Sequence, residues 1–510
     1  MSVARQGVTA SGAFQLVKLG SRDRWRLPVA WAGLSVAALL VPQSEAGTAW
    51  VFLGIAAAPI LLWLKSNDDL YLPLALVAAA YLVGIPLQVL VDPEKLPEWP
   101  IAVANTYKDL ALRWMLEGFL VFVFAYLIGR GRGVARLRVR SSRETIDASA
   151  RATRLLTWCG TVGTAAMLVV GRGDAYTFGQ DLEQKPASSF GMLLQLGLIA
   201  APVAVFMWER AAGHGILTRK DPAYVALWLV VCVWMVGAGT KGVPMLLLLA
   251  VFLPRVLTKR KSAVRFALLL LGAIASTLII FSVFTNFREV AGEDLSPHAA
   301  GLFENLRFQG DVMKEAAKRT SEEISDGTVF GFGGGRRQTR VEQAVSRLSG
   351  SSLGLATAIQ LTQAASPLEN LEWVPLLPVV AFVPRDVWPE KPEFMNSGRF
   401  ATMLGWNRPL APVGGISIGL SGSLYWLGGH GAIGLGMGLF GWCVAVTAVR
   451  AQSRPAGGWF WQAMVFCLVC NLINVGLEAT SLVVGTIRMS ALLALLEFLA
   501  QRRWHVRTDG

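Results

Sequence analysis

The chain has 510 residues, of which 54% are hydrophobic and only 16% are charged, and its mean hydropathy is +0.49. This composition excludes an ordinary soluble enzyme and a disordered chain, and it is typical of a polytopic membrane protein. The net charge of +13 does not predict a nucleic-acid partner, because its excess lies in predicted cytoplasmic loops beside anionic lipid headgroups.

Apolar segments long enough to cross a bilayer recur along the chain. A helix needs about 17 to 25 such residues, and by that measure we count about twelve segments, which predicts an all-α bundle. The run from Ala223 to Leu257 is divided by Gly239-Thr240-Lys241-Gly242. The twelve segments begin near Leu27, Thr48, Tyr71, Leu110, Leu155, Ser189, Ala223, Val243, Phe266, Gly431, Trp459 and Ser481.

Clusters of basic residues predict how these helices are oriented, because cytoplasmic loops carry an excess of lysine and arginine. The clusters precede the first helix, follow the fourth, separate the eighth from the ninth and close the chain. Alternate threading places all of them on one side. Residues 1–26 and 500–510 are therefore predicted to be cytoplasmic tails of a multi-pass membrane protein.

The same threading divides the rest of the chain. Residues 27–284 hold helices one to nine, 285–430 form a large, partly helical extracytoplasmic loop, and 431–499 hold helices ten to twelve. The polar stretch from Thr285 to Gly415 has 13 basic and 15 acidic residues, so it is almost neutral. Amphipathic patterns predict helices over Gly301 to Ile324 and Arg337 to Thr362. Only this loop is large enough to form a site outside the bilayer.

The positions of the cysteines and histidines argue against a disulfide in the loop and against a zinc site. The five cysteines all lie in predicted helices, so no disulfide is expected in the loop. Cys467 and Cys470 have the spacing of a redox pair, but their apolar helix favours a packing role. Histidines 214, 298, 430 and 505 are scattered over predicted loops on both faces and lack zinc-site spacing. Neither a metal nor a cofactor is expected.

The segment FVPRDVWPEKP, Phe382 to Pro392, is the most informative one in the loop. It combines a rigidly flanked cation with an aromatic ring and a second cation, which suits an anionic, sugar-bearing ligand. Two interpretations of Arg385 remain open. It contacts a phosphate group, or it forms a structural salt bridge with Asp386 or Glu390. The candidate binding residues beside it are Trp388 and Lys391.

Three further cations lie near predicted outer helix ends. Arg288, beside Glu289, follows the ninth helix and either grips a phosphate or extends its charge to the membrane interface. Lys241 lies in a very short outer turn, where it either reaches into the bundle or is a solvated turn residue. Arg172, in an earlier outer loop, is another candidate phosphate contact.

Ionisable residues also occur in and beside apolar helices. Glu478 lies in a turn between the last two helices, and Arg488 follows within the twelfth. An arginine inside a membrane is a functional candidate by default, although a packing pair with a carboxylate is the other interpretation. Arg113 and Glu117 form an i, i+4 pair, which favours mutual neutralisation over catalysis.

Taken together, these features resemble one family. Many helices, one large outer loop late in the chain, an arginine after the preceding helix, then Pro384-Arg385, Trp388 and Lys391-Pro392 resemble bacterial O-antigen and exopolysaccharide repeat-unit polymerases of the Wzy type. The glycine-rich run from Gly414 to Gly438 looks like the stretch that leads such proteins back into the membrane. The resemblance covers the topology, which would be GT-C-like, and residues 284–441 in detail.

The resemblance implies an inverting, metal-independent glycosyltransferase that joins undecaprenyl-diphosphate-linked repeat units on the outer face of a bacterial inner membrane. It would make Arg288 and Arg385 contacts of the diphosphate, whose growing charge they would neutralise. The candidates for a catalytic base are Glu289, Asp386 and Glu478. The other substrate-binding candidates are Arg172, Lys241, Trp388, Lys391, Arg399, Arg408 and Arg488. The implied partners are the lipid-linked donor and acceptor, membrane lipids, a flippase and a chain-length regulator.

Two alternatives belong to other classes. The first is a ligase that moves finished glycan to lipid A core or protein, and such ligases tend to show a histidine with arginine in the outer loop, where His298 is the only central histidine. The second is a transporter or flippase of lipid-linked sugar, which should show internal repeats and ionisable residues spread through the bundle. The spacing of Arg408 to Gly419 does not help to choose among these functions, because 52 glycines make such spacings common by chance.

Overall fold

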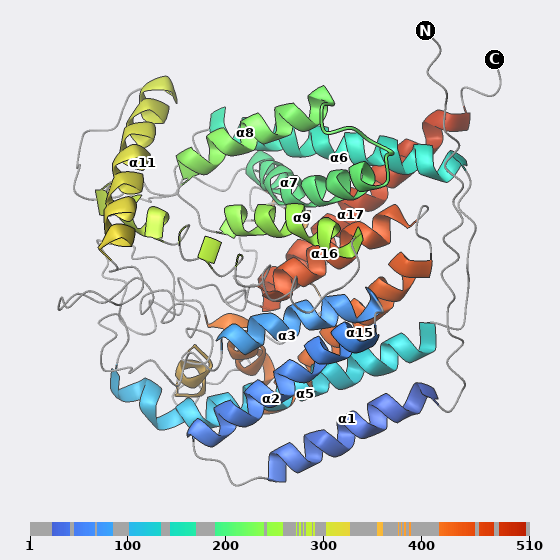
Figure 1. The fold of residues 1–510 in the computed structure, drawn as a ribbon, viewed down its shortest axis with the longest axis vertical. Helices are drawn as coiled ribbons and strands as arrows, with labels where there is room; N and C mark the ends of the chain where they lie inside the picture. Colours follow the sequence, from blue (N-terminus) through green and yellow to red (C-terminus); the bar gives the residue numbers. More distant parts are fainter. Residues whose placement is uncertain are drawn as a thin grey trace.

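The computed structural model presents the chain as a bundle of helices (Figure 1). The structure describes residues 23–40, 45–66, 69–84, 101–133, 143–169, 189–238, 242–258, 282–287, 302–326, 354–360, 418–453, 458–473 and 479–505, with shorter pieces between 272 and 388. None of these residues forms a strand. The prediction of an all-α fold is confirmed for this part of the chain.

The helices begin close to most of the predicted starts. Three differ: α5 begins at Ile101 rather than near Leu110, α6 at Arg143 rather than near Leu155, and α15 at Gly419 rather than near Gly431, because helical backbone continues beyond the apolar residues. The predicted start near Phe266 lies outside the described residues. The bounds are α1 Asp23–Leu40, α2 Glu45–Ser66, η1 Asp69–Tyr71, α3 Leu72–Gly84, α5 Ile101–Gly133, α6 Arg143–Val169, α7 Ser189–Gly213, α8 Pro222–Ala238, α9 Gly242–Thr258, α11 Leu302–Ser325, α15 Gly419–Ser453, α16 Trp459–Ile473 and α17 Ala479–His505.

The outer surface of the bundle is apolar. Four helices, α2, α5, α15 and α17, contain stretches long and apolar enough to cross a membrane, and shorter apolar helices accompany them. Large apolar side chains point outward, among them Leu40, Trp50 and Leu435. Such a surface needs lipid rather than water around it. The chain is therefore a helical membrane protein.

One end of the bundle, here called the basic end, gathers arginine-bearing helix termini. Arg130, near the end of α5, donates a hydrogen bond to the hydroxyl of Tyr71, where α3 begins. Arg151 of α6 donates to the carbonyl oxygen of Ala500 in α17 at 3.2 Å. Arg450, near the end of α15, lies 4.5 Å from the ring centre of Trp461 in α16. These termini lie together, towards the right of Figure 1.

The other end, here called the kink end, is where α15 bends and α17 begins. Before the bend, the hydroxyl of Ser423 accepts a hydrogen bond of 2.7 Å from the backbone N–H of Ala479, the first residue of α17. The hydroxyl group of Ser421 is also hydrogen-bonded to the hydroxyl group of Tyr81 in α3. The first turns of α15 are buried. They therefore fold into the bundle instead of standing outside it.

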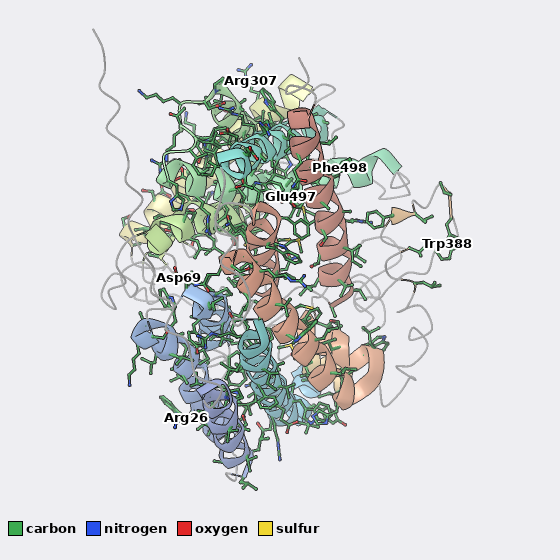
Figure 2. The ribbon with its side chains drawn as sticks, turned by 90° about the vertical axis from the view of Figure 1, so that its right-hand side faces the viewer. Arg26, Asp69, Arg307, Trp388, Glu497 and Phe498 are labelled. Atoms are coloured by element: carbon green, nitrogen blue, oxygen red, sulfur yellow. The ribbon has the colours of Figure 1, made fainter. Side chains whose placement is uncertain are left out.

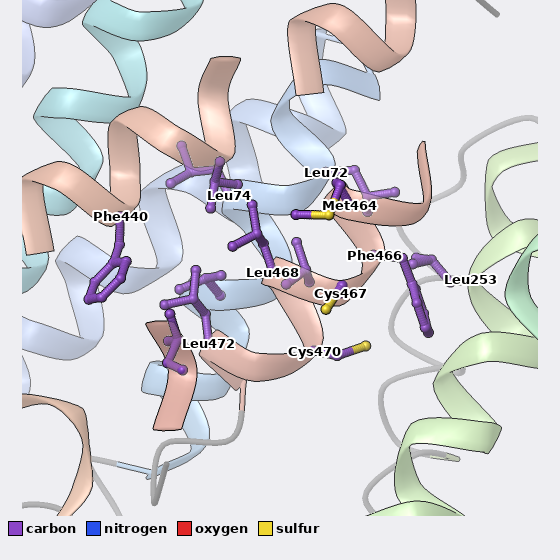
Figure 3. Packing of buried hydrophobic residues seen from close by; sticks show 14 of the residues in the cluster. Leu72, Leu74, Leu253, Phe440, Met464, Phe466, Cys467, Leu468, Cys470 and Leu472 are labelled. Atoms are coloured by element: carbon purple, nitrogen blue, oxygen red, sulfur yellow. The ribbon is translucent and has the colours of Figure 1, made fainter. Parts of the chain in front are cut away.

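Helix α16 runs through the core. Figure 3 shows its side chains packed between α15, α3 and the region around Leu253 of α9. Phe466 stacks on Phe206 of α7, with ring centres 4.2 Å apart. Cys467 and Cys470 are buried and unoxidised in this layer. The predicted packing role of the two cysteines agrees with this position.

Helices α5 and α15 make the closest contact in the bundle, through glycines. A Cβ atom on Gly441 would overlap the carbonyl oxygen of Phe122, and one on Gly118 would lie 2.8 Å from Ile433. Small residues let two helices in a membrane approach to backbone contact, where dispersion forces hold them. This contact fixes α5 against α15 along most of their length and sets their relative rotation.

Helix α11 confirms the amphipathic helix predicted over Gly301 to Ile324. Its apolar face, with Val312 and Ala316, packs on Phe287 and Val290 of the preceding short helical pieces. The amide of Asn286 donates to Thr320 and Glu323 at 3.0 and 3.1 Å. The helix that the sequence placed on the membrane surface or on the bundle is thus held by residues 286–290.

Candidate functional site

The bend in α15 is built on two glycines. Gly429 has a φ of 69°, in the left-handed region that favours glycine, and Gly428 is extended with a φ of −167°. The residues on either side of the bend, Tyr425 and His430, both stack on Trp114 of α5, with ring centres 5.1 and 4.8 Å away. One indole ring therefore holds both arms of the bend.

This stack aligns an ionisable array. The Nε2 atom of His430 lies 2.5 Å from the Oε2 atom of Glu117, which is one turn beyond Trp114 on α5. The other carboxylate oxygen of Glu117 pairs with Nε of Arg113 at 3.4 Å. We call Arg113, Trp114, Glu117, Tyr425 and His430 the kink cluster. It combines an acid, a base, a cation and two aromatic rings.

The kink cluster is partly open. The side chain of His430 is 51% exposed, whereas that of Glu117 is 22% exposed. Both residues lie within the stretches of α5 and α15 that could cross a membrane. At about 1.5 Å per residue, Glu117 is about 20 Å from Arg130 at the basic end. Ionisable groups at such a depth cost free energy unless they are paired, and in membrane proteins they are usually functional.

Three of the candidate residues from the sequence lie in the described part of the chain, each in a different segment. Glu289 is exposed, beside the contact of Val290 with α11. Trp388 is half-buried at the edge of the molecule, away from Asp69 and Glu497 (Figure 2). Arg488 is half-buried in the first half of α17.

The other candidate residues lie outside the described residues. They are Arg172, Lys241, Arg288, Arg385, Asp386, Lys391, Arg399, Arg408 and Glu478. Their roles in phosphate binding and proton transfer stay predictions. Within the described residues, no group of histidine, cysteine, aspartate and glutamate side chains has the geometry of a metal site.

A second polar cluster lies at the basic end, in and beside the turn between α7 and α8. Arg219 donates to both carboxylate oxygens of Glu209, at 3.0 Å from Nε and 2.7 Å from Nη2. The hydroxyl of Tyr224 donates to Oε1 of Glu209 at 2.8 Å. The hydrogen bonds and the charge of Glu209 raise the pKa of the Arg219 guanidinium. This carboxylate is only 3% exposed, so its lone pairs are used within the protein.

The sequence interpretation missed the kink cluster for two reasons. It correctly paired Arg113 with Glu117, but treated that pair as complete. It placed His430 in a loop, whereas the residue lies in α15 just after the bend. The available signals were two charges in the middle of an apolar helix and a Gly-Gly-His sequence at a helix start. Neither signal shows that residues 117 and 430 meet.

Comparisons with known proteins do not identify a family for this chain. The chain matches no protein-family model, no curated protein and no solved structure. The functional interpretation therefore depends on the residues and on their geometry.

Proposed function

We propose that this chain is a polymerase that joins undecaprenyl-diphosphate-linked oligosaccharide repeat units into a cell-surface polysaccharide. The proposal includes a bundle of about twelve membrane helices, cytoplasmic termini at the basic end, and a kink end that faces outward. Arg288 and Arg385 bind the donor diphosphate, and the other loop cations bind nearby. A flippase supplies the repeat units, and a chain-length regulator is a further partner.

The observation that supports this proposal best is the kink cluster. It places an acid–base pair beside stacked aromatic rings, about 20 Å along α5 from Arg130 at the basic end. An acid–base pair of this kind can move the proton of an attacking sugar hydroxyl group. Loss of a diphosphate leaving group also requires positive charge, which the arginines would supply without a metal.

The ligase remains a second candidate, and one observation favours it. The expectation for ligases is a histidine with arginine in the outer loop, whose predicted bounds, 285–430, end at His430. In the structure, His430 and Arg113 share Glu117 as a partner. This arrangement is closer to that expectation than the isolated His298 seen in the sequence. The two functions differ in the acceptor, which is a second lipid-linked repeat unit for the polymerase and a finished lipid or protein acceptor for the ligase.

An assay in detergent separates these functions from transport. The protein is purified in detergent and mixed with lipid-linked repeat units extracted from cells that lack the gene. A polymerase produces a ladder of longer lipid-linked chains, whereas a transporter produces none, since detergent leaves no compartments. A product that forms only after lipid A core is added would support the ligase instead.

The same assay tests the predicted arginine. Arg385→Ala should abolish the ladder while the protein still inserts into the membrane, because transition-state charge stabilisation is lost. Arg385→Lys keeps the positive charge but loses the paired donors of the guanidinium group, so its ladder shows whether charge alone is enough. Ladders of normal length from the alanine variant would contradict the role of Arg385.

A further inference from the structure

We propose that His430 is the general base that removes the proton from the acceptor hydroxyl group, and that Glu117 holds its imidazole ring in place. This inference rests on the proposed glycosyl transfer. It assigns the proton to a residue outside the three carboxylates predicted from the sequence, of which only Glu289 lies in the described part of the chain. Glu289 sits beside the contact of Val290 with α11, on a different helix pair.

The geometry of the imidazole ring supports the assignment. Its Nε2 atom lies 2.5 Å from Oε2 of Glu117, and beside an ionised carboxylate this nitrogen carries the proton and donates it. In the neutral ring, the Nδ1 atom then carries the lone pair. No contact within the described residues occupies Nδ1, and half of the side chain is exposed. One nitrogen is therefore held by the protein while the other is left for an external group.

The surroundings of His430 also fit this role. Trp114 stacks on the ring with an interplanar angle of 23°, which fixes its plane. The ionisable groups that face the ring from the described elements are Glu117 and, through it, Arg113 of α5, with Tyr425 on the other arm of the bend. Glu117 stabilises the imidazolium ion that forms, in the way that a carboxylate orients a catalytic histidine.

The reaction step balances without a cofactor. The acceptor oxygen forms a bond to the anomeric carbon of the donor sugar, and its proton moves to Nδ1 of His430. The bond between that carbon and the phosphate oxygen breaks, and the electron pair leaves with undecaprenyl diphosphate. Because the attack comes from the opposite face, the configuration at carbon inverts. The imidazolium ion then releases its proton to water.

The test uses His430→Gln in the purified, full-length protein. The glutamine amide can still donate to Glu117, so the bend can keep this contact, but it cannot accept a proton. We expect the rate of ladder formation from the extracted lipid-linked repeat units to fall by about 10²- to 10⁴-fold. Glu117→Gln should give a smaller loss. As a matched control, His214→Gln changes a histidine in the turn between α7 and α8 and should leave the rate unchanged.

A pH profile separates catalysis from a purely structural clamp. The wild-type rate should fall in acid, because a protonated imidazole cannot accept the acceptor proton. The residual rate of His430→Gln should lack this acidic decline. A wild-type rate in the glutamine variant, or an unchanged acidic decline, would overturn the assignment of His430 and leave the proposed function standing. A wild-type protein that makes no ladder would overturn both.

Discussion

Glu117 and Glu209 are two carboxylates that pair with arginine in different parts of the same bundle, and their surroundings differ. Glu209 is nearly inaccessible and bonds to Arg219 and Tyr224, which lie 10 and 15 residues away in sequence. Glu117 is more open and contacts His430, 313 residues away. The first cluster joins neighbouring helices through a short turn. The second joins distant helices, and among the described residues the Nδ1 atom of His430 has no hydrogen-bond partner.

The difference indicates separate roles for the two ends. At the basic end, Trp208 also donates to the carbonyl oxygen of Thr218 at 3.1 Å and stacks on Tyr224, so the polar groups of the turn bond within the protein. Such a closed network stabilises a turn but offers little to a substrate. The side chain of His430 is 51% exposed, and the proposed proton transfer uses it. Under this proposal, stability and reactivity are supplied by different pairs.

The largest effect should come from the helix contact that brings Glu117 to His430. Gly441→Ala puts a methyl group against the backbone of Phe122, and we expect a loss of stability of about 3 kcal/mol or more, because backbone cannot move aside as a side chain does. Thermal unfolding in detergent measures this loss.

Gly434→Ala is the matched control on the same helix. A Cβ atom at Gly434 meets nothing within 4 Å, so this variant should unfold at or above the wild-type temperature, since alanine favours helix by about 1 kcal/mol. Equal unfolding temperatures for Gly441→Ala and the wild type would show that the close contact of α5 and α15 does not hold the kink end.

A smaller effect should follow at the basic end. Arg219→Ala leaves the buried carboxylate of Glu209 without its cation, and we expect a loss of about 1–3 kcal/mol, because Arg219 is itself half-exposed. The rate of ladder formation should be retained at temperatures where the variant is folded. As a control, Arg154→Ala removes an exposed partner of Asp221 and should cost about 1 kcal/mol or less. Loss of activity with full stability in Arg219→Ala would contradict a structural role for this end.

The sequence predicted the parts of the fold that hydropathy controls. The break between α8 and α9 follows from Gly239 to Gly242, and the amphipathic α11 follows from its periodicity. Long apolar runs identify helices because each must satisfy its own backbone in lipid. Such runs do not show which helices touch, since every lipid-facing surface is similarly apolar.

The kink cluster illustrates the part that could not be predicted. The contact of Glu117 with His430 depends on glycines at 118 and 441 that bring α5 against α15, and on the left-handed backbone at Gly429 that turns the chain. None of these glycines has a reactive side chain, so the reactive residue types in the sequence do not point to them. The role of Arg385 in the Phe382 to Pro392 segment stays a prediction, because this residue lies outside the described residues.

The most direct test of the proposed function is a gel profile of surface and lipid-linked glycan from cells that lack this gene, with and without a plasmid copy. We expect the ladder to collapse to single repeat units and the plasmid to restore it, whereas a plasmid encoding His430→Gln should not. A ladder that persists on the lipid carrier but never reaches its final acceptor would contradict the polymerase in favour of the ligase. An unchanged profile would contradict both.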